Sequence, residues 1–137
     1  MSKYGIKYCM NSDKGTNDYW AGAVEACGGL DKMPDNSDLA ALAQLLYPSI
    51  TVASTGYTYC PKDENNNYTT CRETEIALSL GFTHSSGTLT DSQAFGVWSG
   101  VEHSSSGAYL RGFNPTYTYR PYGGRYGSNP LAVCLGE

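Results

Sequence analysis

The spacing of apolar residues changes between the two halves of the chain, and this change limits the class of fold. Before residue 82, apolar residues recur every three to four positions in several segments, which is the period of an amphipathic helix. From Phe95 onward they alternate with polar or small residues, which is the period of a strand. Helices followed by a group of strands are typical of an α+β fold. A length of 137 residues predicts a single domain, residues 1–137.

Helices are expected within residues 18–29, 33–48 and 71–82. The second is the most clearly marked, because Asp35 or Ser37 can cap its start and Pro48 ends it. Strands are expected at residues 4–10, 95–103, 107–113, 116–119 and 131–135, with a small-residue break at Ser99-Gly100. Residues 53–71 are polar and rich in turn-forming residues, so a loop is predicted there.

The five cysteines are widely spaced and form no CxxC pair, which gives little support to a zinc site. Such spacing suits disulfides formed in an oxidising compartment, while buried thiols in a cytosolic protein are the alternative. Cys60 and Cys71 bracket a polar segment, and a disulfide between them would stabilise the fold by about 2–3 kcal/mol. Because five is an odd number, one thiol is expected to stay outside any intrachain pair.

The charge and the motifs of the chain argue against several functions. The net charge is −4, whereas nucleic-acid binders usually carry a basic patch and a high isoelectric point. The N-terminal residues lack the apolar core of a signal peptide, and no apolar run is long enough to span a membrane.

Catalytic and metal-binding motifs are also weak. Both histidines, His84 and His103, lie in serine-rich turns, and no GxSxG motif is present. Asp63 and Glu64 lie among asparagines without EF-hand spacing. We therefore expect neither an enzyme nor a protein with a cofactor or a bound metal.

The segment from residue 101 to residue 129 carries an unusual concentration of tyrosine, arginine, glycine and serine. Tyrosine offers a large contact area at a low entropic cost, arginine adds planar hydrogen bonding, and the small residues add adaptability. These are the residue types of protein-binding surfaces. The sequence therefore predicts a ligand-binding surface here, and a tyrosine-rich surface loop without a partner is the alternative.

The order of these segments resembles the C-type lectin fold: an N-terminal strand, two helices packed on a small, mainly antiparallel sheet, long irregular loops, a Trp98-Ser99-Gly100 strand and a closing strand with Val133-Cys134. The chain resembles, more narrowly, the variable proteins of diversity-generating retroelements. Its stretches YWAGAVEACGG, KMPDNSDLAALAQLLYPSI and AVCLGE are similar to C-terminal domains of bacterial prepilin-like surface proteins.

This resemblance implies that residues from about 97 to 137 form a diversified ligand surface on an otherwise fixed scaffold. The scaffold positions would be Trp98, Gly100, Phe113, Ala132 and Cys134. The ligand-binding positions would be Val101, His103, Ser106, Gly107, Tyr109, Leu110, Gly112, Asn114, Tyr117, Tyr119, Arg120, Pro121, Tyr122, Gly123, Gly124, Arg125, Tyr126 and Gly127. Arg120, Tyr122 and Tyr126 are expected to face the ligand, with Tyr117 and Tyr119 packing beneath them.

The resemblance also implies a disulfide between Cys27 and Cys134, with Cys9 left over; a Cys9–Cys27 pair with Cys134 free is the alternative. The Glu-Pro-Asn and Trp-Asn-Asp motifs of calcium-dependent sugar-binding lectins are missing, so that activity is not expected. We expect a non-enzymatic adhesion domain at a bacterial cell surface, associated with a pilus-like protein. Its ligand would be a protein or a glycan, without nucleic-acid binding or membrane insertion. The alternative function is a structural pilin subunit.

Overall fold

The computed structural model describes residues 4–8, 19–82, 84, 87–104, 107–124 and 131–135, and it has the α+β architecture predicted from the sequence. The helices are α1 (Tyr19–Cys27), α2 (Asn36–Leu46) and α3 (Thr74–Ser79), with a 3-10 turn at Leu30–Lys32. The strands are β1 (Tyr4–Tyr8), β2 (Tyr57–Tyr59), β3 (Phe95–Ser104), β4 (Gly107–Phe113), β5 (Tyr117–Tyr119), β6 (Tyr122–Gly124) and β7 (Leu131–Leu135).

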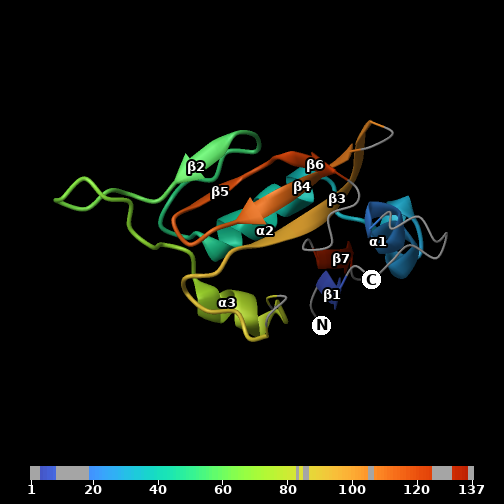
Figure 1. Ribbon diagram of the computed structural model, residues 1–137, viewed down its shortest axis with the longest axis horizontal. Helices are drawn as coiled ribbons and strands as arrows, with labels where there is room; N and C mark the ends of the chain where they lie inside the picture. Colours follow the sequence, from blue (N-terminus) through green and yellow to red (C-terminus); the bar gives the residue numbers. More distant parts are fainter. Residues whose placement is uncertain are drawn as a thin grey trace.

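All of these strands belong to one sheet, in the order β1-β7-β3-β4-β5-β2, with β6 also paired to β4 (Figure 1). Every pairing is antiparallel except the one between β3 and β7, which is parallel. The first and last strands of the chain lie side by side. The sheet therefore has β1 at one edge and the short strand β2 at the other.

Strands β5 and β6 are two parts of one extended line along β4. Gly112 lies opposite Tyr119 in β5, and Tyr109 lies opposite Tyr122 in β6, which is the same register. Between them, the amide of Leu110 donates to the carbonyl of Pro121 at 3.0 Å. Proline has no N–H to return this bond, so the ladder is interrupted at Pro121 while the extended path continues.

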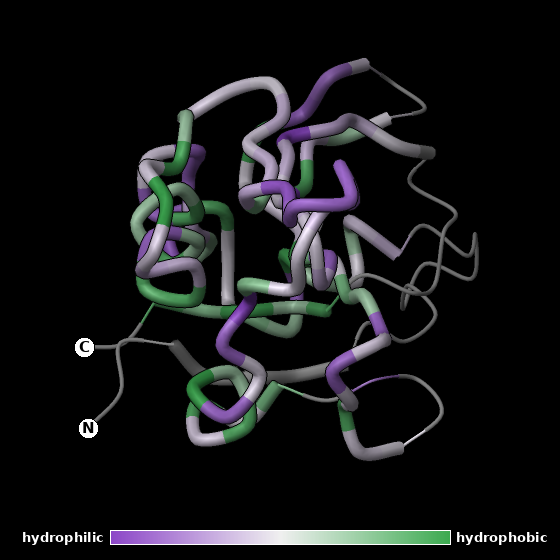
Figure 2. The backbone as a smooth tube through the Cα atoms, turned by 90° about the vertical axis from the view of Figure 1, so that its left-hand side faces the viewer, coloured by the Kyte–Doolittle hydropathy of each residue, from purple (hydrophilic) through white to green (hydrophobic). Residues whose placement is uncertain are grey.

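The two longer helices cover opposite faces of the sheet. Residues opposite each other in neighbouring strands share a face, and successive residues alternate between faces. Val97 and Val133 belong to the cluster that packs around α2, whereas Trp98 and Ala132 belong to the cluster that contains Trp20 of α1. Figure 1 shows α2 lying along the sheet and α1 near its β1–β7 end. Along the tube of Figure 2, hydrophobic and hydrophilic stretches alternate within the helices, as expected for elements with one buried side.

Helix α2 begins as its sequence predicted. The side chain of Asp35 accepts from the amide of Asp38 at 2.9 Å, and the side chain of Asp38 accepts from the amide of Asp35 at 3.0 Å. This reciprocal capping box satisfies amides that have no partner inside the helix. Leu39, Leu42 and Leu46 are all buried on one side, which confirms the predicted apolar face.

The predicted hairpin of β3 and β4 is present, and the small-residue break in it is a real irregularity. The pairing passes from Trp98 opposite Leu110 to Glu102 opposite Ala108, so the β3 side holds extra residues. The hydroxyl of Ser99 donates to the carbonyl of Tyr109 at 2.8 Å and accepts from the amide of Val101 at 3.2 Å. The bulge thus keeps its hydrogen bonds while bending the end of the hairpin.

The prediction that residues 53–71 form only a loop was wrong, because β2 lies within them, and the separate strand β6 was not predicted either. A three-residue strand leaves almost no periodic signal. β2 is formed because it pairs with β5, Tyr57 opposite Tyr119 and Tyr59 opposite Tyr117. Those partners lie about sixty residues away along the chain, so local sequence does not reveal them.

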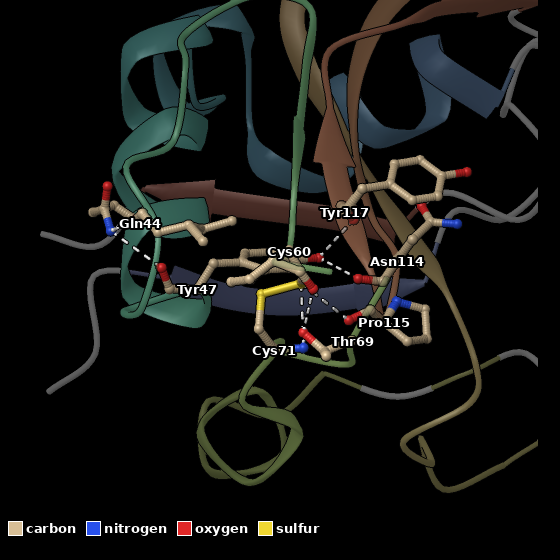
Figure 3. The surroundings of a disulfide bond; sticks show 10 residues. Gln44, Tyr47, Cys60, Thr69, Cys71, Asn114, Pro115 and Tyr117 are labelled. Atoms are coloured by element: carbon tan, nitrogen blue, oxygen red, sulfur yellow. Dashed lines mark hydrogen bonds between the residues drawn. A yellow bond between two sulfur atoms is a disulfide. The ribbon is translucent and has the colours of Figure 1, made fainter. Parts of the chain in front are cut away.

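Two disulfides hold the helices and loops to the sheet. Cys27 at the end of α1 is bonded to Cys134 in β7, and Cys60 is bonded to Cys71 at the base of the segment between β2 and α3 (Figure 3). Both pairs were expected from the sequence and the resemblance. Cys9 lies outside the described residues. Among the described helices, none is both long and apolar enough to cross a membrane.

Candidate ligand-binding surface

An exposed cluster of aromatic and basic side chains lies toward the end of the β3–β4 hairpin. We call it the hairpin cluster, and it consists of His103, Tyr109, Arg120 and Tyr122. The His103 and Tyr122 rings are stacked, with centroids 3.7 Å apart and planes 4° apart. Both rings stand nearly perpendicular to the ring of Tyr109. Tyr122 nevertheless keeps 59% of its surface exposed, so this ring is held in place by its neighbour and still open to solvent.

Arg120 extends the hairpin cluster with a positive charge. Its guanidinium carbon lies 3.9 Å from the centre of the Tyr109 ring, a close cation–π contact. A guanidinium stacked on a ring keeps its N–H donors directed outward in its own plane. The cluster therefore offers a flat aromatic surface beside hydrogen-bond donors suited to an oxyanion.

A second set of aromatic residues, the tyrosine stack, lies on the opposite face of the sheet. Its members are Tyr57, Tyr59, Tyr68, Tyr117 and Tyr119. The centroids of Tyr57 and Tyr119 are 4.7 Å apart with planes 15° apart, and those of Tyr59 and Tyr68 are 4.6 Å apart with planes 21° apart. At such short distances, parallel rings turn their faces toward each other. The stack holds β2 and the segment around Tyr68 against the sheet, while Tyr57, Tyr59 and Tyr68 still keep 57%, 43% and 44% of their surface exposed.

Gly112 provides the base for one end of the tyrosine stack. A Cβ atom at this position would meet Cε1 of Tyr119, would lie 2.8 Å from its Cδ1 and would lie 3.2 Å from its Cζ. The ring of Tyr119 therefore occupies the space that any larger residue at Gly112 would need. Tyr117 and Tyr119 are half-buried in this stack, on the face of the sheet opposite the hairpin cluster, so they do not pack directly beneath Arg120 and Tyr122 as expected.

Burial and neighbouring phenols change the ionisation of the stack. Partial desolvation, with a smaller effect from nearby tyrosines, raises the pKa of Tyr59 and of Tyr119. Tyr47 lies beneath β5, where its hydroxyl donates to the carbonyls of Asn114 at 2.7 Å and Tyr117 at 3.1 Å (Figure 3). Burial raises the pKa of Tyr47 as well, so this phenol remains a neutral donor.

Two buried arginines hold loops against the sheet. Arg111 is fully buried and donates to the hydroxyl of Thr118 at 3.1 Å and to the carbonyls of Ala53 and Ser54 at 3.1 and 3.3 Å. Burial lowers the pKa of Arg111, Tyr47 opposes this effect, and the positive charge of Arg120 lowers the pKa further. Two guanidinium groups therefore lie near each other at this part of the sheet.

Arg72 acts in the same way on the other side of the β4–β5 turn. Its guanidinium donates to the carbonyls of Gln93, Phe113 and Thr90, at 2.5, 2.8 and 2.9 Å, and to the hydroxyl of Thr74 at 3.2 Å. It joins the start of α3, the loop before β3 and the end of β4. Nothing in the sequence indicated that Arg72 and Arg111 are internal, because arginine is seldom buried without a charged partner.

The predicted ligand-binding positions fall into distinct environments. His103 and Tyr122 are exposed, and half-buried positions include Val101, Tyr109, Leu110, Asn114, Tyr117, Tyr119, Arg120, Pro121 and Gly123. Gly107 and Gly112 are buried, so they provide space for neighbours instead of contact area. Gly124 is the last residue of β6. Ser106, Arg125, Tyr126 and Gly127 lie outside the described residues.

Tyr57, Tyr59 and Tyr68 were not among the predicted positions. The alternation of Tyr57 and Tyr59 with Thr58 was the only strand signal in the sequence here, and the segment around it is polar.

Within the part of the chain that the structure describes, no group of histidine, cysteine and acidic side chains has the arrangement of a metal site. The Asp63 carboxylate instead accepts from the amides of Asn65 and Asn67 at 2.9 and 3.0 Å, which orders the turn of this segment. Comparison with family models, with curated proteins and with solved structures finds no match to this chain.

Proposed function

We propose that this chain is a non-enzymatic ligand-binding or adhesion domain, and that the hairpin cluster is the centre of its ligand surface. The observation that carries this proposal is the ordering of an exposed Tyr122 ring by His103, next to an Arg120 guanidinium stacked on Tyr109. Pre-ordered aromatic and arginine side chains lose little entropy when a ligand binds. They are also the residue types that contribute most to binding energy in interfaces.

The frame beneath this surface supports a C-type lectin-like arrangement. The N-terminal strand pairs with the closing strand, and a disulfide joins α1 to β7. The Trp98-Ser99-Gly100 segment lies at the start of the bulge that bends the hairpin. The Cys27–Cys134 disulfide and the strand that contains Trp98-Ser99-Gly100 are the features that the resemblance implied. We propose on this basis that the chain is a variable protein of a diversity-generating retroelement, with its diversified positions within residues 97–137.

The two disulfides support an extracellular setting, since such bonds persist in oxidising compartments. Our proposal places the domain at a bacterial cell surface as part of a pilus-like protein. The expected ligand is a protein or a glycan.

The proposal is tested with a double variant, Arg120→Ala with Tyr122→Ala. Binders would be selected from a displayed peptide and protein library on the wild-type domain, and their affinities for the variant measured. We expect at least a tenfold loss of affinity for most binders, with the melting temperature changed by less than about 5 °C, because these side chains are at the surface. Leu45→Ala is the control, since this leucine of α2 is also exposed (48%) and is not one of the four residues of the hairpin cluster.

Binders that keep full affinity for the double variant would contradict the proposal. A variant that binds ligands normally but fails to assemble with neighbouring subunits would favour the structural pilin function. The retroelement assignment has a separate test in the surrounding DNA. It requires a reverse transcriptase gene and a near-copy of the segment encoding residues 97–137 that differs at adenines.

A further inference from the structure

The ring of Tyr122, in the strand β6 that lies beside β4 (Figure 1), is open on one face. Its other face is covered by the His103 ring, with centroids 3.7 Å apart and planes 4° apart. The Tyr109 ring approaches it nearly at a right angle, with centroids 6.0 Å apart. Tyr122 still keeps 59% of its surface exposed, so the second face of its ring lies toward solvent. The stacking on His103 fixes the direction of this open face.

The polar groups of the hairpin cluster are available to a ligand. Within the part of the chain that the structure describes, its four side chains make ring and cation–π contacts and no hydrogen bond or ion pair. They comprise a guanidinium with several N–H donors, two phenol hydroxyls and an imidazole. A ligand that covered these groups without giving them partners would lose binding energy. The ligand is therefore expected to carry several hydrogen-bonding groups as well as a surface that packs on a ring.

The charge of the cluster is positive and has no acidic partner among the described residues. Arg120 lies opposite Arg111 in the register that β5 and β6 share along β4. The buried Arg111 guanidinium donates only to neutral oxygens, such as the hydroxyl of Thr118. Glu102 is opposite Ala108, which places its side chain on the other face of the sheet. Two uncompensated guanidinium groups on a chain of net charge −4 make this place complementary to an anion.

A sugar ring that carries a carboxylate meets these three requirements together. The C–H groups of a sugar ring carry a slight positive charge and pack on the negative face of an aromatic ring. Its hydroxyls donate to and accept from phenols and an imidazole, and its carboxylate accepts two hydrogen bonds from a guanidinium. An apolar or aromatic side chain of a protein ligand would pack on Tyr122, but it would leave the polar groups around it without partners.

We propose that the hairpin cluster binds an acidic saccharide, with a sugar ring stacked on the open face of Tyr122 and the carboxylate of that sugar held by Arg120. This inference rests on the proposed function of the hairpin cluster and names the class of ligand. The two residues are two positions apart along the extended line of β5 and β6, so their side chains share a face and their positions are about 7 Å apart. The guanidinium binds the carboxylate directly, so the contact does not use calcium.

The carboxylate can belong to a sialic acid or to a uronic acid, and the test distinguishes these two sources. It uses three fluorescent conjugates: lactose, sialyllactose, and a disaccharide that ends in glucuronic acid. Their binding to the disulfide-bonded domain is measured by fluorescence anisotropy. We expect at least one acidic conjugate to bind at least tenfold more tightly than lactose, and we expect a methyl ester on its carboxylate to remove this advantage. Chelation of calcium with EDTA should leave the affinity unchanged.

Three variants locate the contacts. Arg120→Ala should remove the preference for the acidic conjugate over its methyl ester, because the group that distinguishes them is gone. Tyr122→Ala should weaken the binding of the acid and of the ester by the same factor, because both stack on this ring. Lys62→Ala is the matched control, since it also removes an exposed cation that lies over a tyrosine ring, 5.0 Å from the centre of Tyr68. It should leave both affinities unchanged.

Equal affinity for the acid and its methyl ester would overturn the carboxylate contact, and so would a preference that survives Arg120→Ala. Failure of both acidic conjugates to bind, or loss of their binding in EDTA, would also overturn this inference. The proposed function would still stand if library-selected proteins lost affinity for the Arg120→Ala, Tyr122→Ala variant. It would fail together with this inference only if no selected binder depended on the hairpin cluster.

Discussion

Gly112 gives the sharpest test of how the surface is built, because one methyl group there is expected to disturb the whole tyrosine stack. In Gly112→Ala, the added Cβ would lie 2.8 Å from Cδ1 and 3.2 Å from Cζ of Tyr119 and would overlap Cε1. The backbone of Gly112 does not need a positive φ, so the cost comes from the ring alone. Overpacking of this kind costs about 1–3 kcal/mol.

Displacement of the Tyr119 ring also removes its contact with Tyr57, whose centroid is 4.7 Å away. Aromatic pairs contribute about 0.5–1.5 kcal/mol beyond the area that they bury. We therefore expect Gly112→Ala to lower the free energy of unfolding by about 2–4 kcal/mol in urea denaturation. Gly123→Ala is the matched control in the neighbouring strand, because its Cβ would meet only the end of the flexible Leu110 side chain, at 3.3 Å. Its expected cost is below about 1 kcal/mol.

A double-mutant cycle identifies the cause. If Tyr119 is the obstacle, Gly112→Ala should cost little in a Tyr119→Ala background, and the coupling between the two positions should be about 1–3 kcal/mol. A Gly112→Ala protein as stable as the wild type, or a coupling near zero, would refute the packing described for this position. The result also bears on diversification, since a residue that supports the stack has little freedom to vary.

Three further outcomes are expected. Replacing both cysteines of the Cys60–Cys71 pair by alanine should lower the free energy of unfolding by about 3 kcal/mol, and the same change in the Cys27–Cys134 pair should lower it by about 5 kcal/mol. The second bond closes the longer loop, since the sequence separations are 11 and 107. Equal losses in urea denaturation would argue against loop closure as the cause. Arg111→Ala should cost about 2–4 kcal/mol, because it empties a fully buried site and leaves its carbonyl acceptors unpaired; an unchanged unfolding midpoint would refute this role. The pKa values of Tyr59 and Tyr119 are raised in the folded state, so these phenols stay protonated to a higher pH in the folded than in the unfolded protein. Their contribution to stability should therefore be present below about pH 10 and decline as the pH rises further. Ultraviolet titration of the folded protein should show phenol ionisation above the ordinary tyrosine range, and ionisation at the ordinary value would contradict the prediction.

Much of the secondary structure was predictable because its signals are local. The leucine spacing of α2 and its Asp35 cap act within a few residues of each other, and so do the alternation of β4 and the apolar run of β7. The Cys60–Cys71 disulfide was predicted from a short separation and the polar segment between the cysteines. The high tyrosine and arginine content between β3 and β7 was also visible, and it pointed to a binding surface before any geometry was known.

The division of these aromatic residues into two sets was decided only by the tertiary structure. Tyr119 and Tyr122 are three positions apart and have the same chemistry, yet one packs on Gly112 within the tyrosine stack and the other is exposed beside His103. The face that each side chain takes depends on the register of β5 and β6 against β4. A shift of one residue would exchange the two roles.

The sequence by itself determined where the helices and the longer strands form, because propensity, capping and periodicity act over short distances. Only the tertiary structure decided that Arg72 and Arg111 are buried and donate hydrogen bonds to loop carbonyls, that β2 exists, and that β2 stops short of β6. These features depend on contacts between residues far apart in the chain, such as Arg111 with Ala53 and Tyr57 with Tyr119. Register and packing bring such residues together, and neither is encoded in any single segment.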